Sequence, residues 1–312
     1  MKNETEITHF ILKGLTDQQE LRNILFSLFL VLYLVTVLGN GTIVSVVAAE
    51  THLHTPMYFF LSNLSCLDIC YSTVILPKML SGLLRAHQRI SFAGCITQLH
   101  FFHFLGSSEA ILLTVMAYDR YVAICNPLHY SIIMCTRNCV LLAAATWTTG
   151  FFHALMHAIM TSQLHFCGPN FIQHFFCDIK PVLRLACSSI TLNLSLLNIV
   201  TVFIAMTTFF LTLFSYLYII SFLLLKVKSN SKRWKAFSTC SSHLTVVGLL
   251  YVPVLFNYIR SSSRESPQVD MIATLMYSVV TSVLNPLIYT LRNQDMKSAI
   301  RKCLGRLISP EI

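Results

Sequence analysis

Charged side chains are scarce in this sequence. Asp, Glu, Lys and Arg together make up 11% of its 312 residues, whereas a soluble globular chain carries about 25%. So few charges cannot cover a surface that faces water, which largely excludes a secreted, cytosolic or nucleic-acid-binding fold. Apolar residues make up 55% of the chain, and the mean hydropathy is +0.66. These values predict a polytopic membrane protein whose outer surface faces lipid.

Motifs of two other functional classes are also missing. The sequence has neither an HExxH metal-binding pattern nor a GxSxG nucleophile pattern, and no carboxylate pair falls at a predicted water-facing site. It shows neither the inverted repeats nor the paired helix interruptions that a transporter would have. We therefore expect neither an enzyme nor a transporter. Because no linker or low-complexity tract appears, residues 1–312 are predicted to form a single domain.

Seven apolar stretches are long enough to cross a bilayer, since a spanning helix needs about 20 residues. They predict an all-α membrane protein, a seven-transmembrane helix bundle. The predicted spans are Ile24–Ala48, Met57–Leu83, Gly94–Ala123, Val140–Met160, Leu194–Leu225, Phe237–Ile259 and Asp270–Leu291.

Basic residues predict how the bundle is oriented, because short cytoplasmic loops are rich in Lys and Arg. The connection 226–235, between the fifth and sixth spans, holds five basic residues and no acidic one. With this loop in the cytoplasm, the N-terminal segment 1–23 is extracellular, and the chain is a multi-pass protein of the plasma membrane. The glycosylation pattern at Asn3 agrees, because it is usable only in the lumen. The net charge of +9 then suits loops that face the acidic inner leaflet.

Two segments outside the spans are distinctive. Residues 161–193 are predicted to form a long second extracellular loop. Residues 292–312 form the cytoplasmic tail, in which Met296, Ile300 and Leu304 recur at helical spacing between basic residues. This pattern predicts an amphipathic helix that lies on the inner leaflet.

Four of the eleven cysteines fall where disulfides form. Cys95 begins the third span, and Cys167, Cys177 and Cys187 lie in the long loop, all in oxidising space. Four cysteines allow three pairings, and their spacing does not choose among them. The remaining cysteines are expected to be small buried apolar residues, except that Cys303 in the tail is either a lipidation site or an ordinary cysteine.

Two histidine pairs share helix faces, because their members are separated by three or four residues. The pairs are His100 with His103 and His153 with His157. We interpret His103, His153 and His157 as the polar lining of a cavity, and the alternative is a role in packing the bundle. Two imidazoles are too few for a closed zinc site, so no metal is expected here.

Polar residues at membrane depth are costly and mark functional positions. Asp68, Glu109, Asn40 and Asn285 are predicted to lie at similar depth. Together they would form a polar pocket able to hold a small cation or to share a proton. The alternative is hydrogen bonding between helices.

Six motifs, in order and at matching spacing, identify a family. They are Gly39-Asn40, LHTPMYFFLSNLSCLD at Leu53–Asp68, MAYDRYVAIC at Met116–Cys125, Ser215-Tyr216, KAFSTCSSHL at Lys235–Leu244 and LNPLIYTLRN at Leu284–Asn293. The loop stretch Phe166–Asp178 adds a seventh. Over essentially its whole length the chain resembles a vertebrate odorant receptor, a member of the rhodopsin-like G-protein-coupled receptors.

The resemblance implies two disulfides, Cys95–Cys177 and Cys167–Cys187. It also implies a small odorant ligand and coupling to the heterotrimeric stimulatory G protein of olfactory neurons, and so to cyclic AMP. A chemoreceptor of the same fold that acts outside the olfactory epithelium is the alternative.

The resemblance also assigns a role to Arg120, which lies beside Asp119 at the inner end of the third span. An isolated Arg there would serve as an interfacial anchor. In the family pattern it is instead the switch that engages the G protein, with Tyr216 and Tyr289 as its partners in the active state. The polar pocket at membrane depth resembles the sodium site of such receptors, which implies a bound sodium ion at Asp68 and Glu109.

The resemblance further implies a ligand cavity between the outer halves of the third to seventh spans. The expected lining is largely apolar with a few donors and acceptors, which is typical of a small-molecule site. It contains no buried carboxylate, so we expect a small, neutral, mostly apolar volatile ligand rather than an amine held by an ion pair, with His103 and Tyr258 orienting its polar group. The candidate residues are Phe102, His103, Gly106, Ser107, His153, Val200, Thr201, Ile204, Tyr251, Val254, Leu255, Tyr258 and Ser278.

Overall fold

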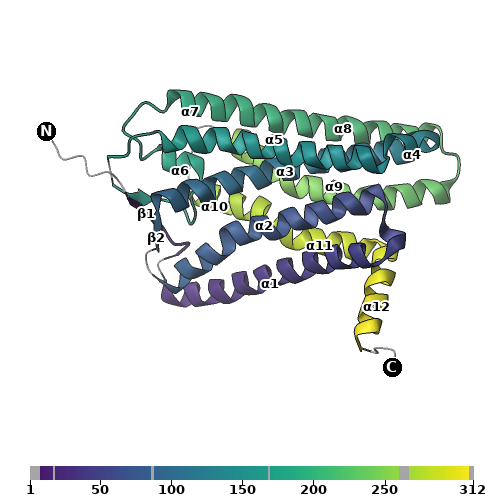
Figure 1. The fold of residues 1–312 in the computed structure, drawn as a ribbon, viewed down its shortest axis with the longest axis horizontal. Coiled ribbons are helices and arrows are strands. Elements are labelled where there is room, and N and C mark those ends of the chain that lie inside the picture. Colours follow the sequence, from purple (N-terminus) through teal and green to yellow (C-terminus); the bar gives the residue numbers. More distant parts are fainter. Residues whose placement is uncertain (1–7, 17, 86–87, 168, 260–266, 309–312) are drawn as a thin grey trace.

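The protein is a bundle of long helices. The computed structural model describes residues 8–16, 18–85, 88–167, 169–259 and 267–308, without the side chains of 232, 235, 239, 257–259, 267, 291–292, 304 and 306–308. Among these residues, seven helical segments are long and apolar enough to cross a membrane, which confirms the predicted architecture. Figure 1 shows them running along the long axis of the molecule, with a small sheet at one end and a separate short helix, α12, at the other. We call these the sheet end and the α12 end.

Each span begins before its predicted apolar stretch, because helical backbone bonding continues into the polar flanks. The single-helix spans are α1 (Gln19–Ala49), α2 (Pro56–Leu84), α3 (Phe92–Cys125), α5 (Thr136–Ser162) and α9 (Asn230–Ile259). The fifth span joins α7 (Thr191–Leu196), a π-helical turn at Leu197–Thr201 and α8 (Val202–Leu225), and the seventh joins α10 (Pro267–Leu275), a π-helical turn at Met276–Val280 and α11 (Thr281–Arg292). Shorter helical segments are Thr51–Leu53, Pro127–His129, α4 (Tyr130–Ile133) and α6 (Ile179–Leu183).

The predicted tail helix is α12 (Gln294–Ile308), which leaves the bundle at an angle in Figure 1. Met296 and Ala299 are buried against the bundle. Lys302 Nζ lies 2.8 Å from Oε2 of Glu50, a buried residue at the end of α1. The amphipathic helix therefore has a polar as well as an apolar attachment.

The sheet was not anticipated from the sequence. Its order is β2 (Gln88–Ser91), β1 (His9–Leu12) and β3 (Phe171–Ile172), with β1 antiparallel to β2 and parallel to β3. Phe10 on β1 is fully buried, and its ring meets that of Phe166 edge to face at 5.5 Å. Through β1, the N-terminal segment thus joins the connection between α2 and α3, which carries β2, to the long connection between α5 and α7, which carries β3.

A proline explains how the first and seventh spans pack. Pro286 in α11 has no N–H, so the carbonyl of Ser282, four residues earlier, lacks its helical donor. Asn40 Nδ2 on α1 donates to that carbonyl at 3.1 Å. Gly39 allows the approach, because a Cβ there would lie 3.2 Å from the Pro286 ring. The Gly39-Asn40 motif therefore satisfies a backbone group that proline leaves unpaired.

Replacement of Asn40 by Leu is expected to destabilise the protein. The change leaves the buried Ser282 carbonyl without a donor, which costs about 1–3 kcal/mol. The melting temperature of purified protein in detergent measures the effect. Asn23→Leu is the matched control, because Asn23 is exposed near the start of the same helix. Equal melting temperatures for the two variants would contradict this role of Asn40.

Candidate functional site

Two disulfides shape the loop at the sheet end. One joins Cys95 at the start of α3 to Cys177, with Cα atoms 5.4 Å apart, and the other joins Cys167 to Cys187 within the loop, with Cα atoms 5.9 Å apart. This is the pairing that the family resemblance implied. The first bridge brings the loop down onto α3.

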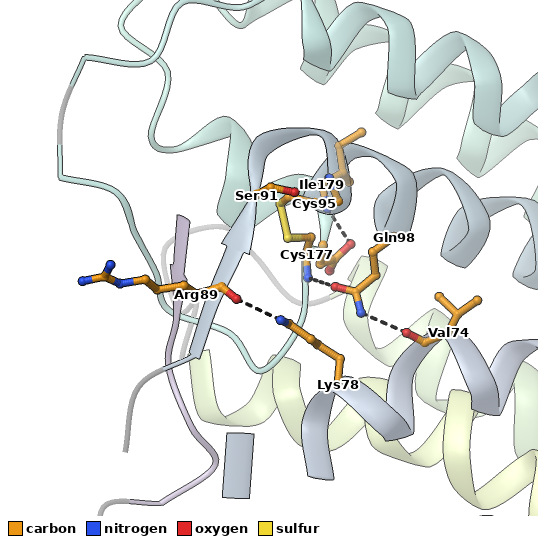
Figure 2. The surroundings of a disulfide bond; sticks show 10 residues. Val74, Lys78, Arg89, Ser91, Cys95, Gln98, Cys177 and Ile179 are labelled. Atoms are coloured by element: carbon orange, nitrogen blue, oxygen red, sulfur yellow. Dashed lines mark hydrogen bonds between the residues drawn. A yellow bond between two sulfur atoms is a disulfide. The ribbon is translucent and has the colours of Figure 1, made fainter. Parts of the chain in front are cut away.

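Gln98, one turn after Cys95, holds the same loop by hydrogen bonds. Figure 2 shows its side chain between the backbone of Val74 and that of Cys177. Nε2 of Gln98 donates to the Val74 carbonyl at 2.9 Å, and Oε1 accepts from the Cys177 N–H at 3.0 Å. One side chain thereby joins α2, α3 and the loop.

Beneath this loop lies a cavity of about 620 Å³. It is enclosed by α2, α3, α5, the fifth, sixth and seventh spans and the loop. The expected residues that line it are Phe102, His103, Gly106, Ser107, His153, Thr201, Ile204, Tyr251 and Val254.

Other expected residues are found elsewhere. Val200 and Leu255 do not line the cavity, and Ser278 is fully buried with its hydroxyl bonded to the Thr274 carbonyl at 2.5 Å. Val200 and Ser278 lie in the π-helical turns at Leu197–Thr201 and Met276–Val280, where the side chains depart from the regular helical spacing on which the expectation was based. Asn3 and the side chain of Tyr258 lie outside the described residues.

Histidines connect three spans beside the cavity. Ser107 Oγ lies 2.8 Å from His153 Nδ1, and Thr201 Oγ1 lies 3.1 Å from His153 Nε2 and 3.3 Å from His157 Nε2. His153 both lines the cavity and joins α3, α5 and the fifth span, whereas His157 is buried and takes part in packing alone. Both interpretations that the sequence left open thus apply to His153, whereas only the packing role applies to His157.

We expected a lining without a buried carboxylate, but Asp178 and Asp270, each partly buried, line the cavity. Asp178 Oδ1 accepts from the Ile179 N–H at 2.7 Å and lies 3.6 Å from His103 Nε2. Burial raises the pKa of Asp178, but the contact with His103, the neighbouring His174 and the Ile179 N–H outweigh it and bring the pKa below its ordinary value. The carboxylate is therefore ionised at neutral pH.

Sequence reasoning missed the whole roof of the cavity. The loop carries no helical or strand periodicity, and its tertiary contacts, namely the disulfides, the sheet and the hydrogen bond to Gln98, determine which of its residues face inward. A polar residue directly after a predicted disulfide cysteine was the one available signal. The roof residues are Pro169, Phe171, Gln173, His174, Asp178, Ile179, Lys180, Pro181, Arg184 and Leu185.

At the α12 end, Arg120 is paired within its own helix. Its Nε lies 3.8 Å from Asp119 Oδ2, and Asp119 Oδ1 accepts from the Tyr130 hydroxyl at 2.8 Å. Asp119 is buried. This arrangement holds the guanidinium against the bundle.

The two tyrosines that the resemblance assigned to Arg120 have other surroundings in this structure. Tyr216 Oη lies 2.6 Å from His243 Nδ1 on α9. Tyr289 Oη is buried and has no hydrogen-bond partner in the described part of the chain. Neither hydroxyl is bonded to Arg120 here among the described residues.

The polar residues at membrane depth come together only in part. Asn285 Nδ2 donates to both oxygens of Asp68, at 3.0 and 3.1 Å, whereas Asn40 donates to backbone carbonyls. Glu109 Oε1, Asn40 Oδ1 and Asn285 Oδ1 are buried oxygens that lack a partner within the described ranges. Buried oxygens without donors are the ligands that a hard cation takes.

Comparison with known proteins gives a consistent picture. A family model described as "Olfactory receptor" matches residues 29–306. The chain is 58% identical to olfactory receptor 12D1 of Homo sapiens over 100% of this chain and 97% of that protein, and 57% identical to human olfactory receptor 12D3 over 98% and 97%. It is 46% identical to olfactory receptor 1f45 of Rattus norvegicus over 97% of this chain and 96% of that protein.

Loss of either partner of the Cys95–Cys177 bridge is expected to have the same effect. Cys95→Ser and Cys177→Ser each free the loop and should cost about 2–5 kcal/mol of stability, and the double variant should lose no more than either single one. Melting temperatures of the three purified variants measure this. Peptide mapping after non-reducing digestion provides the direct check, and a peptide that joins Cys95 to Cys167 would contradict the pairing.

Proposed function

The chain belongs to the olfactory receptor family, and we propose on that basis that it is an odorant receptor whose ligand occupies the cavity at the sheet end. The ligand is small, volatile and mostly apolar. Its binding activates a stimulatory G protein and so raises cyclic AMP. The cavity carries the proposal: at about 620 Å³ it falls among small-molecule sites, which measure about 300–1,000 Å³.

The sheet end faces the outside of the cell, and the N-terminus is extracellular at the plasma membrane. Two disulfides lie at that end, and such bonds persist in oxidising space. The basic connection 226–235 and the basic residues of α12 lie toward the other end, as the enrichment of Lys and Arg in cytoplasmic loops requires.

The signal passes along α3. This helix lines the cavity at His103 and carries Arg120 seventeen residues later, about 25 Å along its axis. Arg120 exchanges Asp119 for groups of the G protein when the ligand shifts the helix. A planar, permanently charged guanidinium can make that exchange, and a neutral side chain cannot.

A sodium ion binds at membrane depth. Asp68 supplies the negative charge, and Glu109 and Asn285 offer buried oxygens that lack donors in the described part of the structure. An ion there would neutralise charge that is otherwise costly between helices.

Stimulation of cells that express the protein tests the receptor function. At least one compound in a chemically diverse odorant panel should raise cyclic AMP, and Arg120→Ala should abolish the response while surface expression persists. Arg137→Ala, which changes an exposed arginine at the start of α5, is the control and should respond normally. If no compound raises cyclic AMP through the wild type, in cells where a control receptor responds, the proposed receptor function is wrong. Normal signalling by Arg120→Ala would contradict the role of Arg120 as the switch but would leave the receptor function unaffected.

Sodium should stabilise the purified protein. At a concentration ten times its dissociation constant, the ion contributes about 1.4 kcal/mol, so the melting temperature should be higher in sodium chloride than in choline chloride. Asp68→Asn should lose this difference. Glu20→Gln, which changes an exposed carboxylate of α1, should keep it. Equal melting of the wild type in the two salts would exclude the site.

A further inference from the structure

Asp178 is a charge held in a defined place at the roof of the cavity. It follows Cys177 directly, so the disulfide to Cys95 and the hydrogen bond that the Cys177 N–H donates to Gln98 fix its position above α3. Its side chain is 20% exposed, and that of His103, 3.6 Å away on α3, is 13% exposed. The cavity thus faces a carboxylate whose partner across the space is one imidazole.

His174 adds an unsatisfied acceptor to the same part of the roof. Only 2% of its surface is exposed, it lines the cavity, and neither ring nitrogen has a hydrogen-bond partner in the described part of the chain. Burial lowers its pKa, so at neutral pH the ring is uncharged and one nitrogen can accept a hydrogen bond. Buried polar atoms are satisfied as a rule, and a group in the cavity would satisfy this one.

Two basic side chains, Lys180 and Arg184, also line the cavity. Arg184 is exposed and Lys180 is partly buried. Long basic side chains carry their charge toward water while their stems cover apolar surface. Asp178, by contrast, meets α3 directly, at His103.

We propose that this receptor selects small alkyl amines, whose ammonium group binds between Asp178 and His174, and that it rejects carboxylic acids. The inference rests on the proposed function and specifies its ligand. An alkyl amine is protonated at neutral pH, as a lysine side chain is, and its three N–H donors match the carboxylate and the free imidazole nitrogen. The ammonium takes the place of His103 at Asp178. The alkyl chain lies against Phe102, Ile204 and Val254.

Binding of three six-carbon probes to the purified full-length receptor tests this inference. Hexylamine, hexanol and hexanoate share a chain and differ in charge, so isothermal calorimetry at pH 7 isolates the headgroup. Hexylamine should bind at least about tenfold more tightly than hexanoate, because hydrogen bonds to a charged group are worth that much or more. Asp178→Asn keeps an oxygen for the Ile179 N–H but removes the charge, and it should weaken hexylamine about ten- to a hundredfold while hexanol changes little.

Two further variants separate selection from structure. His103→Leu removes the group that competes with the ammonium, so it should strengthen hexylamine binding, a gain that mere damage to the fold cannot produce. Asp270→Asn changes the other carboxylate of the lining and should leave the preference for the amine in place. The inference is overturned if hexanoate binds the wild type as tightly as hexylamine, if Asp178→Asn binds hexylamine normally, if Asp270→Asn alone loses it, or if hexylamine does not bind.

Cyclic AMP assays with the same probes keep the two proposals apart. If hexanol or another neutral odorant raises cyclic AMP while hexylamine fails to bind, the result supports the receptor function and contradicts the preference for amines. If hexylamine binds in a manner that depends on Asp178 but no compound raises cyclic AMP, the result supports the ligand class and contradicts coupling to a stimulatory G protein.

Discussion

The hydrocarbon core of a membrane offers a peptide group no hydrogen-bond partner, so the backbone groups of every span must be paired within the protein. This constraint makes each span helical, and it makes a proline within a span a local defect. Pro286 leaves the Ser282 carbonyl without its helical donor, and Asn40 from another span supplies one. Because Gly39 leaves room for the proline ring, the same contact fixes how closely α1 approaches α11.

Different chemistry governs the sheet end, where the chain leaves the apolar region. There the Cys95–Cys177 bridge, the two hydrogen bonds of Gln98 and the strand β1 hold the loop over the bundle. The cavity consequently has walls of helix and a roof of loop. Its walls are mostly apolar, with a few hydroxyl and imidazole groups and the carboxyl group of Asp270, whereas its roof carries several charged side chains, including that of Asp178.

The helix α3 connects these regions, because it carries a distinct residue at each depth. Cys95 binds the loop, His103 faces the cavity, Glu109 lies among the buried polar residues and Arg120 lies at the α12 end. Its 34 residues extend about 51 Å as one stiff helix. Under the proposed function, a ligand that contacts α3 at His103 therefore acts on the same rigid helix that ends at the G-protein surface.

The sequence by itself determined the number of spans, their approximate limits, the tail helix and the family, because apolar length and local motifs are properties of contiguous residues. It also indicated much of the cavity wall, such as Phe102, Ser107 and Tyr251, where regular helical spacing applies. The tertiary structure alone decided the sheet, the inward-facing side of the π-helical turns and the charged roof. Asp178 meets His103 only because a disulfide folds a loop without periodicity onto α3, and contacts between residues far apart in a chain leave no local pattern to read.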